Sequence, residues 1–187
     1  MFSVCVFCGS SFGADPAFTA AAATVGRSIA ERGWTLVYGG GRVGLMGVVA
    51  NAALGAGGRV VGVIPRFLYE WEVGHDGLTE LEIVATLAER KLRLGDLADA
   101  FVSLPGGVGT LDEMFEAWSW SQLGVQAKPN GLLNVGGFYA PLIEFLDRAT
   151  ESGFIRPVHR AMLTVSDDPL ALLDELERLG QRGKTAD

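Results

Sequence analysis

The chain of 187 residues carries 22 acidic and 15 basic side chains, and its formal net charge of −7 argues against a nucleic-acid-binding surface. Hydrophobic residues make up 49% of the sequence, but their runs are too short to cross a membrane. The N-terminus also lacks the basic and apolar regions of a signal peptide. We therefore expect a cytoplasmic protein that folds as a single domain over residues 1–180, with neither nucleic acid nor a membrane as partner.

Predicted strands and helices alternate along the chain. The strands are continuous apolar runs at residues 2–8, 35–39, 59–64, 81–85, 100–104, 131–135 and 162–165. Helical periodicity covers residues 16–32, 44–57, 87–98, 110–123, 139–152 and 168–180, and an Asp-Pro pair opens the first and the last of these helices. This alternation predicts an α/β fold, a Rossmann-like open parallel sheet of about seven strands with helices on both faces.

Two segments fall outside this pattern. Residues 66–80 show no clear periodicity, and we expect a loop that lies over the functional site. Residues 181–187 form a polar C-terminal tail that we expect to fray.

Cys5 and Cys8 have the spacing of a redox pair, but both lie inside the first predicted strand instead of at a helix N-terminus. A separation of three residues directs them to opposite faces of the sheet, so we expect two buried structural cysteines. His75 and His159 show no metal-ligand spacing, and no metal site is expected.

Loops rich in glycine or serine follow the first, second and fifth predicted strands, at residues 9–13, 39–44 and 105–110. In an open α/β sheet, ligands bind beyond the carboxyl ends of the strands, at the point where the strand order reverses. We therefore expect these loops to converge on one crevice.

The third loop has the most informative sequence. Glycines 106, 107 and 109 stand where a predicted strand passes into a helix, and that junction offers free backbone N–H groups to an anion. Thr110 and Glu113 have the spacing of a helix capping box, so Glu113 has two possible roles. It either caps the helix or faces a ligand held at the helix N-terminus.

Other phosphate-binding classes fit the sequence poorly. Gly39-x-Gly41-x-x-Gly44 satisfies the dinucleotide fingerprint, but it follows the second strand and lacks the acidic residue that binds the ribose. The loop at 105–110 lacks the lysine of a P-loop NTPase. Lys91 is the only candidate for a pyridoxal phosphate lysine near the site, and its context beside Arg90 favours phosphate binding.

Several motifs together resemble the LOG family, the cytokinin-activating phosphoribohydrolases that were often labelled lysine decarboxylase-like. Residues 105–113 match the Pro-Gly-Gly-x-Gly-Thr-x-x-Glu signature of that family, and Arg90-Lys91 precedes Glu113 by the separation of 23 residues found there. Further matches are Cys8-Gly9-Ser10-Ser11, Gly39-Gly40-Gly41, Gly44-Leu45-Met46-Gly47, Gly62-Val63-Ile64-Pro65 and Lys128-Pro129. The resemblance extends over residues 2–170.

The resemblance implies hydrolysis of the N-glycosidic bond of an adenosine 5′-monophosphate, modified at N6, to free base and ribose 5-phosphate. Arg90 and Glu113 are then the expected catalytic residues, and no cofactor is expected. The alternative is a protein that binds a nucleotide or the molybdenum cofactor without turnover, because related Rossmann-like proteins carry that cofactor.

The family also implies a set of substrate-binding positions. These are Glu72, Arg90, Lys91, Gly106, Gly107, Val108, Gly109, Thr110, Leu111, Asp112, Glu113 and Ser119, with Gly9, Ser10, Gly40 and Gly41 as possible phosphate or ribose contacts. Glu72 and the Arg90-Lys91 pair also have simpler interpretations, as a solvated loop carboxylate and a solvated pair on a helix face.

A homodimer is expected through the helices at 87–98 and 110–123, with the active site close to the interface. The second helix carries more apolar residues than one sheet-facing stripe requires: Leu111, Met114, Phe115, Trp118, Trp120 and Leu123. Dimers are also typical of the shorter family members.

Overall fold

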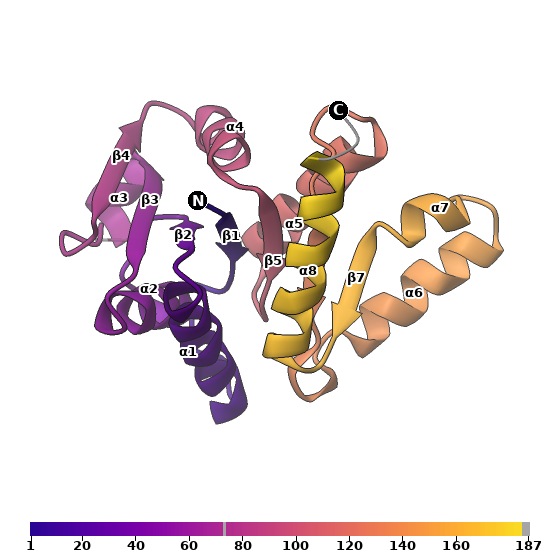
Figure 1. Cartoon of the computed structure of the whole chain (residues 1–187), viewed down its shortest axis with the longest axis horizontal. Coiled ribbons are helices and arrows are strands. Elements are labelled where there is room, and N and C mark those ends of the chain that lie inside the picture. Colours follow the sequence, from indigo (N-terminus) through magenta and orange to yellow (C-terminus); the bar gives the residue numbers. More distant parts are fainter. Residues whose placement is uncertain (73, 185–187) are drawn as a thin grey trace.

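A computed structural model describes residues 1–72 and 74–184, and it has the predicted fold. Seven parallel strands form a single sheet in the order β4-β3-β2-β1-β5-β6-β7 (Figure 1). The strands are β1 (Ser3–Phe7), β2 (Thr35–Tyr38), β3 (Arg59–Pro65), β4 (Glu80–Val84), β5 (Ala100–Ser103), β6 (Asn130–Leu133) and β7 (Leu163–Ser166). The chain builds outward from β1 to β4 and then returns to the other side of β1, so the strand order reverses there.

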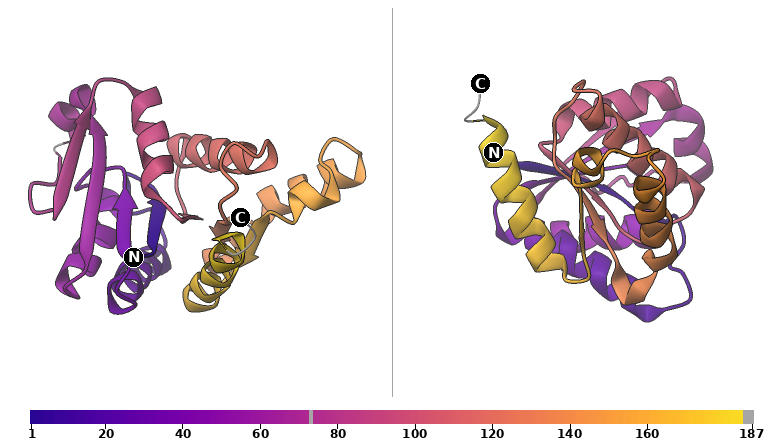
Figure 2. Two further views of the ribbon diagram at one scale, coloured as in Figure 1. Left: turned by 45° about the horizontal axis from the view of Figure 1, so that its top comes forward. Right: turned by 90° about the vertical axis from the view of Figure 1, so that its right-hand side faces the viewer.

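Helices cover both faces of this sheet (Figure 2). One face packs on α1 (Pro16–Glu31), α2 (Gly44–Gly55) and α8 (Pro169–Lys184), and the other packs on α4 (Leu87–Leu97) and α5 (Val108–Gln122). The remaining helices are α3 (Arg66–Glu72), a 3-10 turn η1 (Val135–Gly137), α6 (Ala140–Glu151) and α7 (Pro157–Arg160). The central strand β1 is buried on both sides, as expected from its continuous apolar sequence.

The two cysteines lie on opposite faces of the sheet, which confirms the prediction for the first strand. Cys5 packs in the core beneath α4 and α5, whereas Cys8, just beyond the strand, packs with residues of α1 and α2. Both are buried free thiols on opposite faces, as the sequence predicts.

The Asp-Pro openings of the first and last helices are also confirmed. The Asp15 carboxylate accepts a hydrogen bond from the Ala17 N–H at 2.8 Å, with Pro16 in the first turn of α1. Asp168 accepts from the N–H groups of Leu170 and Ala171 in the same way.

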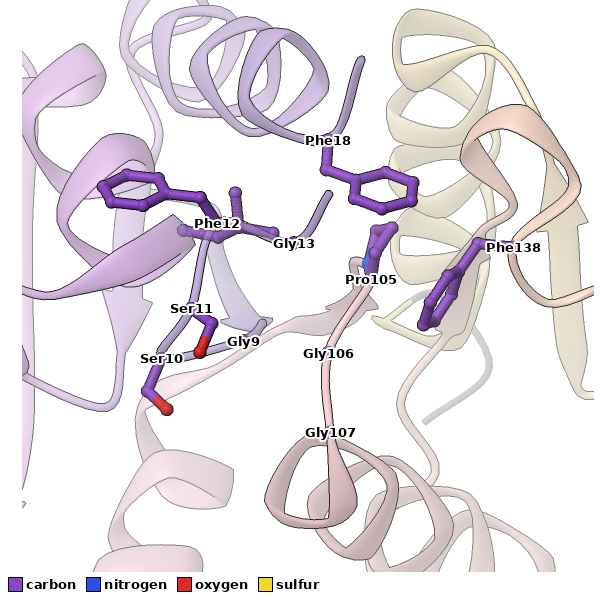
Figure 3. Close-up of a pocket in the computed structure, with 11 residues that line it drawn as sticks. Gly9, Ser10, Ser11, Phe12, Gly13, Phe18, Pro105, Gly106, Gly107 and Phe138 are labelled. Carbon is purple, nitrogen blue, oxygen red and sulfur yellow. The ribbon is translucent and has the colours of Figure 1, made fainter. Parts of the chain in front are cut away.

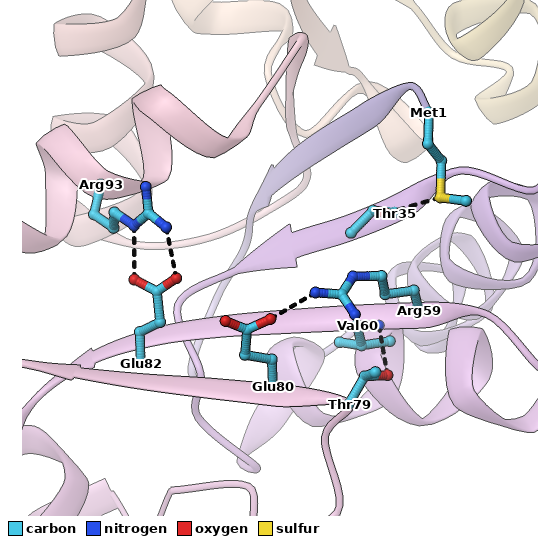
Figure 4. Close-up of polar contacts among 8 residues, drawn as sticks. All are labelled: Met1, Thr35, Arg59, Val60, Thr79, Glu80, Glu82 and Arg93. Carbon is cyan, nitrogen blue, oxygen red and sulfur yellow. Dashed lines mark hydrogen bonds and ion pairs between the residues drawn. The ribbon is translucent and has the colours of Figure 1, made fainter.

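Ion pairs tie the edge strand β4 to its neighbours (Figure 4). Arg93 on α4 forms a two-pronged contact with Glu82, with Nε and Nη2 donating at 2.7 and 2.8 Å. Arg59 on β3 donates to Glu80 at 2.6 Å. Because Arg93 lies one turn beyond Arg90, the first of these contacts fixes the part of α4 that carries Arg90.

The prediction of a loop at 66–80 is wrong for the first half of that segment. There, Arg66–Glu72 form helix α3 directly after β3. The rings of Phe67 and Trp71 pack edge to face, 5.8 Å apart, on one side of this helix. Seven residues are too few to show a helical period in the window that a sequence pattern needs. The short α7 was missed for the same reason.

The structure excludes the first of the two alternatives for Glu113, the capping box with Thr110. Helix α5 begins at Val108, its N-cap is Gly107, and no side chain caps it. Thr110 is therefore the third residue of the helix, and it is buried. The free N–H groups at this end remain available to a ligand.

The C-terminal helix continues to Lys184, beyond the predicted boundary at residue 180. Residues 185–187 of the predicted tail lie outside the described residues. In the part of the chain that the structure describes, no helix has both the length and the apolar composition of a membrane span.

Candidate active site at the carboxyl edge of the sheet

A cavity of about 210 Å³ lies beyond the carboxyl ends of β1 and β5, where the strand order reverses. Ten residues line it: Cys8, Gly9, Ser10, Met46, Arg90, Gly107, Val108, Gly109, Thr110 and Glu113. They come from the loop after β1, from α2 and α4, and from the first turns of α5. This is the crevice that the topology predicts.

The N-terminus of α5 forms one wall of this cavity. A methyl group placed on Gly107 or Gly109 would meet no atom within 4 Å, so the backbone there is open on the ligand side. Since no side chain caps this 15-residue helix, its first N–H groups and the positive end of its dipole are free to bind an anion.

Gly106 has a different role from these open glycines. A methyl group on Gly106 would lie 2.1 Å from the Thr110 hydroxyl and 2.9 Å from the Gly9 nitrogen. Glycine at 106 therefore lets Thr110 pack beneath the loop and lets the loops after β1 and β5 meet. The Gly9 N–H donates to the Pro105 carbonyl at 3.1 Å and fixes this contact.

Arg90 and Glu113 face each other across the cavity. The Arg90 Nη2 atom is 3.8 Å from Glu113 Oε1, and the two side chains are only 12% and 15% exposed. Burial raises the pKa of Glu113, and the Arg90 charge opposes that rise. The arrangement places a shielded carboxylate and a neighbouring cation in the same cavity as the uncapped N-terminus of α5.

A second cavity of about 400 Å³ adjoins the first and shares Arg90, Gly109 and Glu113 with it. Its other lining residues are Leu68, Leu87, Ala88, Lys91, Asp112 and Glu116. Leu68 belongs to α3, so the segment predicted as a loop over the site contributes a wall as a helix.

Lys91 faces this second cavity and is held by two carboxylates. Its Nζ lies 2.7 Å from Asp112 and 3.2 Å from Glu116. Partial burial lowers the pKa of Lys91, but the hydrogen bonds to these carboxylates outweigh it, and the net shift is upward. Lys91 therefore stays charged.

A third cavity, of about 260 Å³, shares Gly9, Ser10 and Gly107 with the first (Figure 3). The side chains of Phe18, Pro105 and Phe138 line one side of it, and Ser10 and Ser11 lie on the other. Its aromatic wall suits a phosphate poorly. The charged cavity beside Arg90 is the better anion site.

The chain is similar to proteins of known family. Residues 46–176 match the family described as possible lysine decarboxylase. A cytokinin riboside 5′-monophosphate phosphoribohydrolase of Arabidopsis thaliana is 45% identical over 174 residues, which cover 93% of this chain and 80% of the plant protein. A probable phosphoribohydrolase of the same name from Oryza sativa subsp. japonica is also 45% identical, over 93% of this chain and 71% of its own length.

The chain belongs to the LOG family. Among solved structures, the molybdenum cofactor carrier protein of Chlamydomonas reinhardtii aligns with a TM-score of 0.72 at 20% identity, over 95% of this chain and 97% of the carrier. The molybdenum cofactor binding protein of Rippkaea orientalis aligns with a TM-score of 0.70, also at 20% identity, over 95% and 96% of the two chains. At this identity the likeness shows the fold alone, and the fold is the predicted Rossmann-like one.

The family positions predicted from the sequence lie in different places around the site. Most of them line the first cavity or the second. Gly106 borders the aromatic cavity. Leu111 packs against the core between α5, α6 and β7. The exposed Ser119 lies outside the residues that line these three cavities. The side chain of Glu72 lies outside the described residues, so its role stays a prediction.

Gly40 and Gly41, in the loop at 39–44 of this LOG-family chain, are not among the residues that line the three cavities. Gly40 packs close to Ile64 and Leu81, and its carbonyl accepts the His75 N–H. Gly41 pairs with Gly74 in an isolated bridge. A phosphate or ribose contact from either glycine stays a prediction.

Six residues that line the first two cavities were not among the predicted site residues: Cys8, Met46, Leu68, Leu87, Ala88 and Glu116. Cys8 and Met46 line the first cavity, and both belong to motifs that were recognised as family matches, so a usable sequence pattern existed. Burial raises the pKa of the Cys8 thiol far above its usual value, so it stays protonated. Leu68 was missed because its helix, α3, was not predicted.

The older family description is not supported by the chemistry of the described residues. A decarboxylase that uses pyridoxal phosphate needs a lysine free to form a Schiff base. Lys91 is the lysine at this site, and two carboxylates hold it in its charged form. Among the residues described here, no cluster of His, Cys, Asp and Glu has the arrangement of a metal site.

Proposed function

We propose that this protein hydrolyses the N-glycosidic bond of N6-modified adenosine 5′-monophosphates and releases the free base and ribose 5-phosphate. The observation that carries the proposal is the shielded Arg90–Glu113 pair beside the open N-terminus of α5. Family membership supports it, because relatives about 45% identical over most of the chain are named as phosphoribohydrolases of this kind.

The two polar cavities suit the parts of such a nucleotide. The 5′-phosphate would lie on the N–H groups of residues 108–110, where the absence of side chains on Gly107 and Gly109 lets it approach. The ribose would then lie against the Arg90–Glu113 pair. The base would extend into the second cavity, whose walls include the apolar Leu68, Leu87 and Ala88.

In the reaction, the bond between the anomeric carbon and the base nitrogen breaks, and water supplies the new oxygen at that carbon. One proton of the water stays on the new anomeric hydroxyl, and the other goes to a general base. The departing base nitrogen takes up one proton, so the reaction consumes and releases no net proton. The ribose passes through a state with oxocarbenium character, as in other glycoside hydrolyses. Ionised Glu113 would hold the ribose hydroxyls and activate the water, and Arg90 would orient the substrate and stabilise the charge that develops.

Incubation with nucleotides tests the proposal. The purified protein is mixed with isopentenyl-AMP or AMP, and base and ribose 5-phosphate are followed by liquid chromatography and mass spectrometry. We expect both products, and formation slowed by ~10²–10⁴-fold with Glu113→Gln. A nucleotide that binds without cleavage would instead support the carrier function.

We also propose a homodimer with the active site close to the interface. On α5, Met114 and Trp118 are buried within the chain, and Trp120 packs close to Gly95 of α4. Phe115 and Leu123 remain 37% and 68% exposed, and Val125 lies beside them in sequence and is also exposed. These side chains supply apolar surface for a second subunit, and two-fold pairing is the commonest form of soluble oligomer.

The domain organisation and the cellular location are proposals too. We propose that residues 1–180 behave as one folding unit and that the protein acts in the cytoplasm. A single cooperative unfolding transition would support the first of these. Fractionation of cells that express the tagged protein would test the second.

A further inference from the structure

The side chain of Arg90 is held by two backbone carbonyls at the ends of neighbouring strands. Its Nε donates to the Val63 carbonyl on β3 at 3.2 Å, and its Nη2 donates to the Gly39 carbonyl, just after β2, at 3.2 Å. These two bonds fix the plane of the guanidinium group. They leave Nη1 and one Nη2 hydrogen to face Glu113 and a ligand.

Gly39 leaves the space that the guanidinium occupies. A methyl group on Gly39 would lie 2.0 Å from Arg90 Nη2 and 3.1 Å from Cζ. The backbone of Gly39 is not in the left-handed region, unlike that of Gly40 and Gly44. Glycine is therefore needed at 39 for space and not for backbone conformation.

We propose that Gly39 is a positioning residue for catalysis, which places Arg90 against Glu113 through its missing side chain and its carbonyl oxygen. The loop at 39–44 then serves the reaction by holding the side chain of Arg90, whereas the loop at 105–110 holds the phosphate. This inference rests on the proposed function for its kinetic consequences. The contact between Gly39 and Arg90 does not depend on any substrate.

The different surroundings of the glycines support this division. Gly107 and Gly109 face open space, where a ligand can approach, whereas the space beside Gly39 is filled by Arg90. A ligand cannot occupy a position that the guanidinium already fills. A substitution at Gly39 therefore acts first on the arginine and only through it on the substrate.

The first test is Gly39→Ala, with Gly55→Ala as its matched control. Gly55 lies at the end of α2, and a methyl group there meets nothing within 4 Å. We expect Gly39→Ala to lower kcat by about 10²-fold, the effect typical of a small misplacement of a catalytic group, with little change in KM. Gly55→Ala should retain wild-type kinetics. A raised KM with unchanged kcat would overturn the proposal, because it would mean that the loop binds the substrate.

A double-mutant cycle tests whether Gly39 acts through Arg90. In the background of Arg90→Ala, the further change Gly39→Ala should alter kcat by less than about 2-fold, because the contact is already lost. If the double variant instead shows the full additional loss, Gly39 acts by another route and the proposal is wrong.

Thermal unfolding without substrate separates this inference from the proposed function. Gly39→Ala should lower Tm, and Arg90→Ala in the same chain should restore part of the loss, because it removes the atoms that clash. This holds even if Gly39→Ala alone does not fold. Losses that simply add would overturn the inference, whatever the wild-type protein does to nucleotides.

Discussion

At the scale of single residues, the environment of Glu113 decides what the site can do. The carboxylate is shielded from water, its pKa is raised by burial, and Arg90 lies 3.8 Å away. A carboxylate with a raised pKa is a stronger base than an exposed glutamate. The same burial makes the ionised group unfavourable for folding.

Replacing this carboxylate should separate activity from stability. We expect Glu113→Gln to lower kcat by ~10²–10⁴-fold, because glutamine keeps the size of the side chain but cannot act as a base or carry the charge. Steady-state kinetics with isopentenyl-AMP measure the loss. Near-native turnover would show that Glu113 has no catalytic role.

The matching control is the thermal stability of Glu113→Gln. Because the pKa of Glu113 is raised in the folded protein, the folded state binds its proton more tightly than the unfolded chain does. Ionised Glu113 therefore opposes folding at neutral pH, and this effect fades as the pH falls below the raised pKa. Tm of the variant at pH 7 should equal or exceed that of the wild type.

The pH dependence of the reaction should report the same group. Activity should fall on the acidic side through a pKa above the usual range of glutamate, since protonation removes the base. The charge of Asp112 contributes to raising the pKa of Glu113, so Asp112→Asn should move this limb to lower pH. Profiles of kcat/KM against pH test both statements, and a limb unmoved by Asp112→Asn would contradict this view of the electrostatics.

At the scale of elements, the N-terminus of α5 offers free backbone N–H groups that can bind an anion. The helix begins without a side-chain cap, and its first residues present backbone N–H groups to the cavity. This arrangement needs the strand β5 to end at Ser103 and the chain to turn through Gly106 and Gly107 before the helix starts.

Activity should therefore depend strongly on the 5′-phosphate. We expect kcat/KM for adenosine to be at least ~10²-fold below that for AMP, since each hydrogen bond to a charged group contributes roughly 1.5–3 kcal/mol. The riboside of isopentenyladenine should be poorer than its monophosphate by a similar factor. Equal values for nucleoside and nucleotide would show that the helix end binds some other group.

The sequence predicts most of these elements correctly and misses others. Long strands and helices, the two Asp-Pro openings and the opposite faces of Cys5 and Cys8 follow from periodicity and local chemistry. Helix α3 was missed because seven residues cannot show a helical period, and the capping box at Thr110 failed because the glycines let α5 start earlier. The contact between Gly39 and Arg90 joins positions far apart in sequence, so no local pattern could predict it.

At the scale of the whole molecule, the crevice lies where the strand order reverses at β1, and the helices on one face of the sheet carry its charged pair, Arg90 and Glu113. Arg90 comes from α4 and Glu113 from α5, and these are the helices expected at the subunit interface. Pairing there would shield the cavities further.

The proposed assembly predicts a mass of about twice the 19.8 kDa of one chain by light scattering at micromolar concentration. Leu123→Glu should shift the mass toward that of a monomer, because it places a charge in the apolar contact. Leu170→Glu, at a half-exposed position on α8, is the control and should leave the mass unchanged. A wild-type mass of one chain would refute the dimer, and a hexamer would reveal a second interface.

The central claim is that this site breaks the bond between base and ribose while leaving the phosphate ester intact. Phosphorus NMR during incubation with isopentenyl-AMP tests it most directly. We predict that the nucleotide signal is replaced by that of ribose 5-phosphate, with an equal amount of free base and no inorganic phosphate. An unchanged nucleotide signal with folded protein, or the release of inorganic phosphate, would contradict the claim.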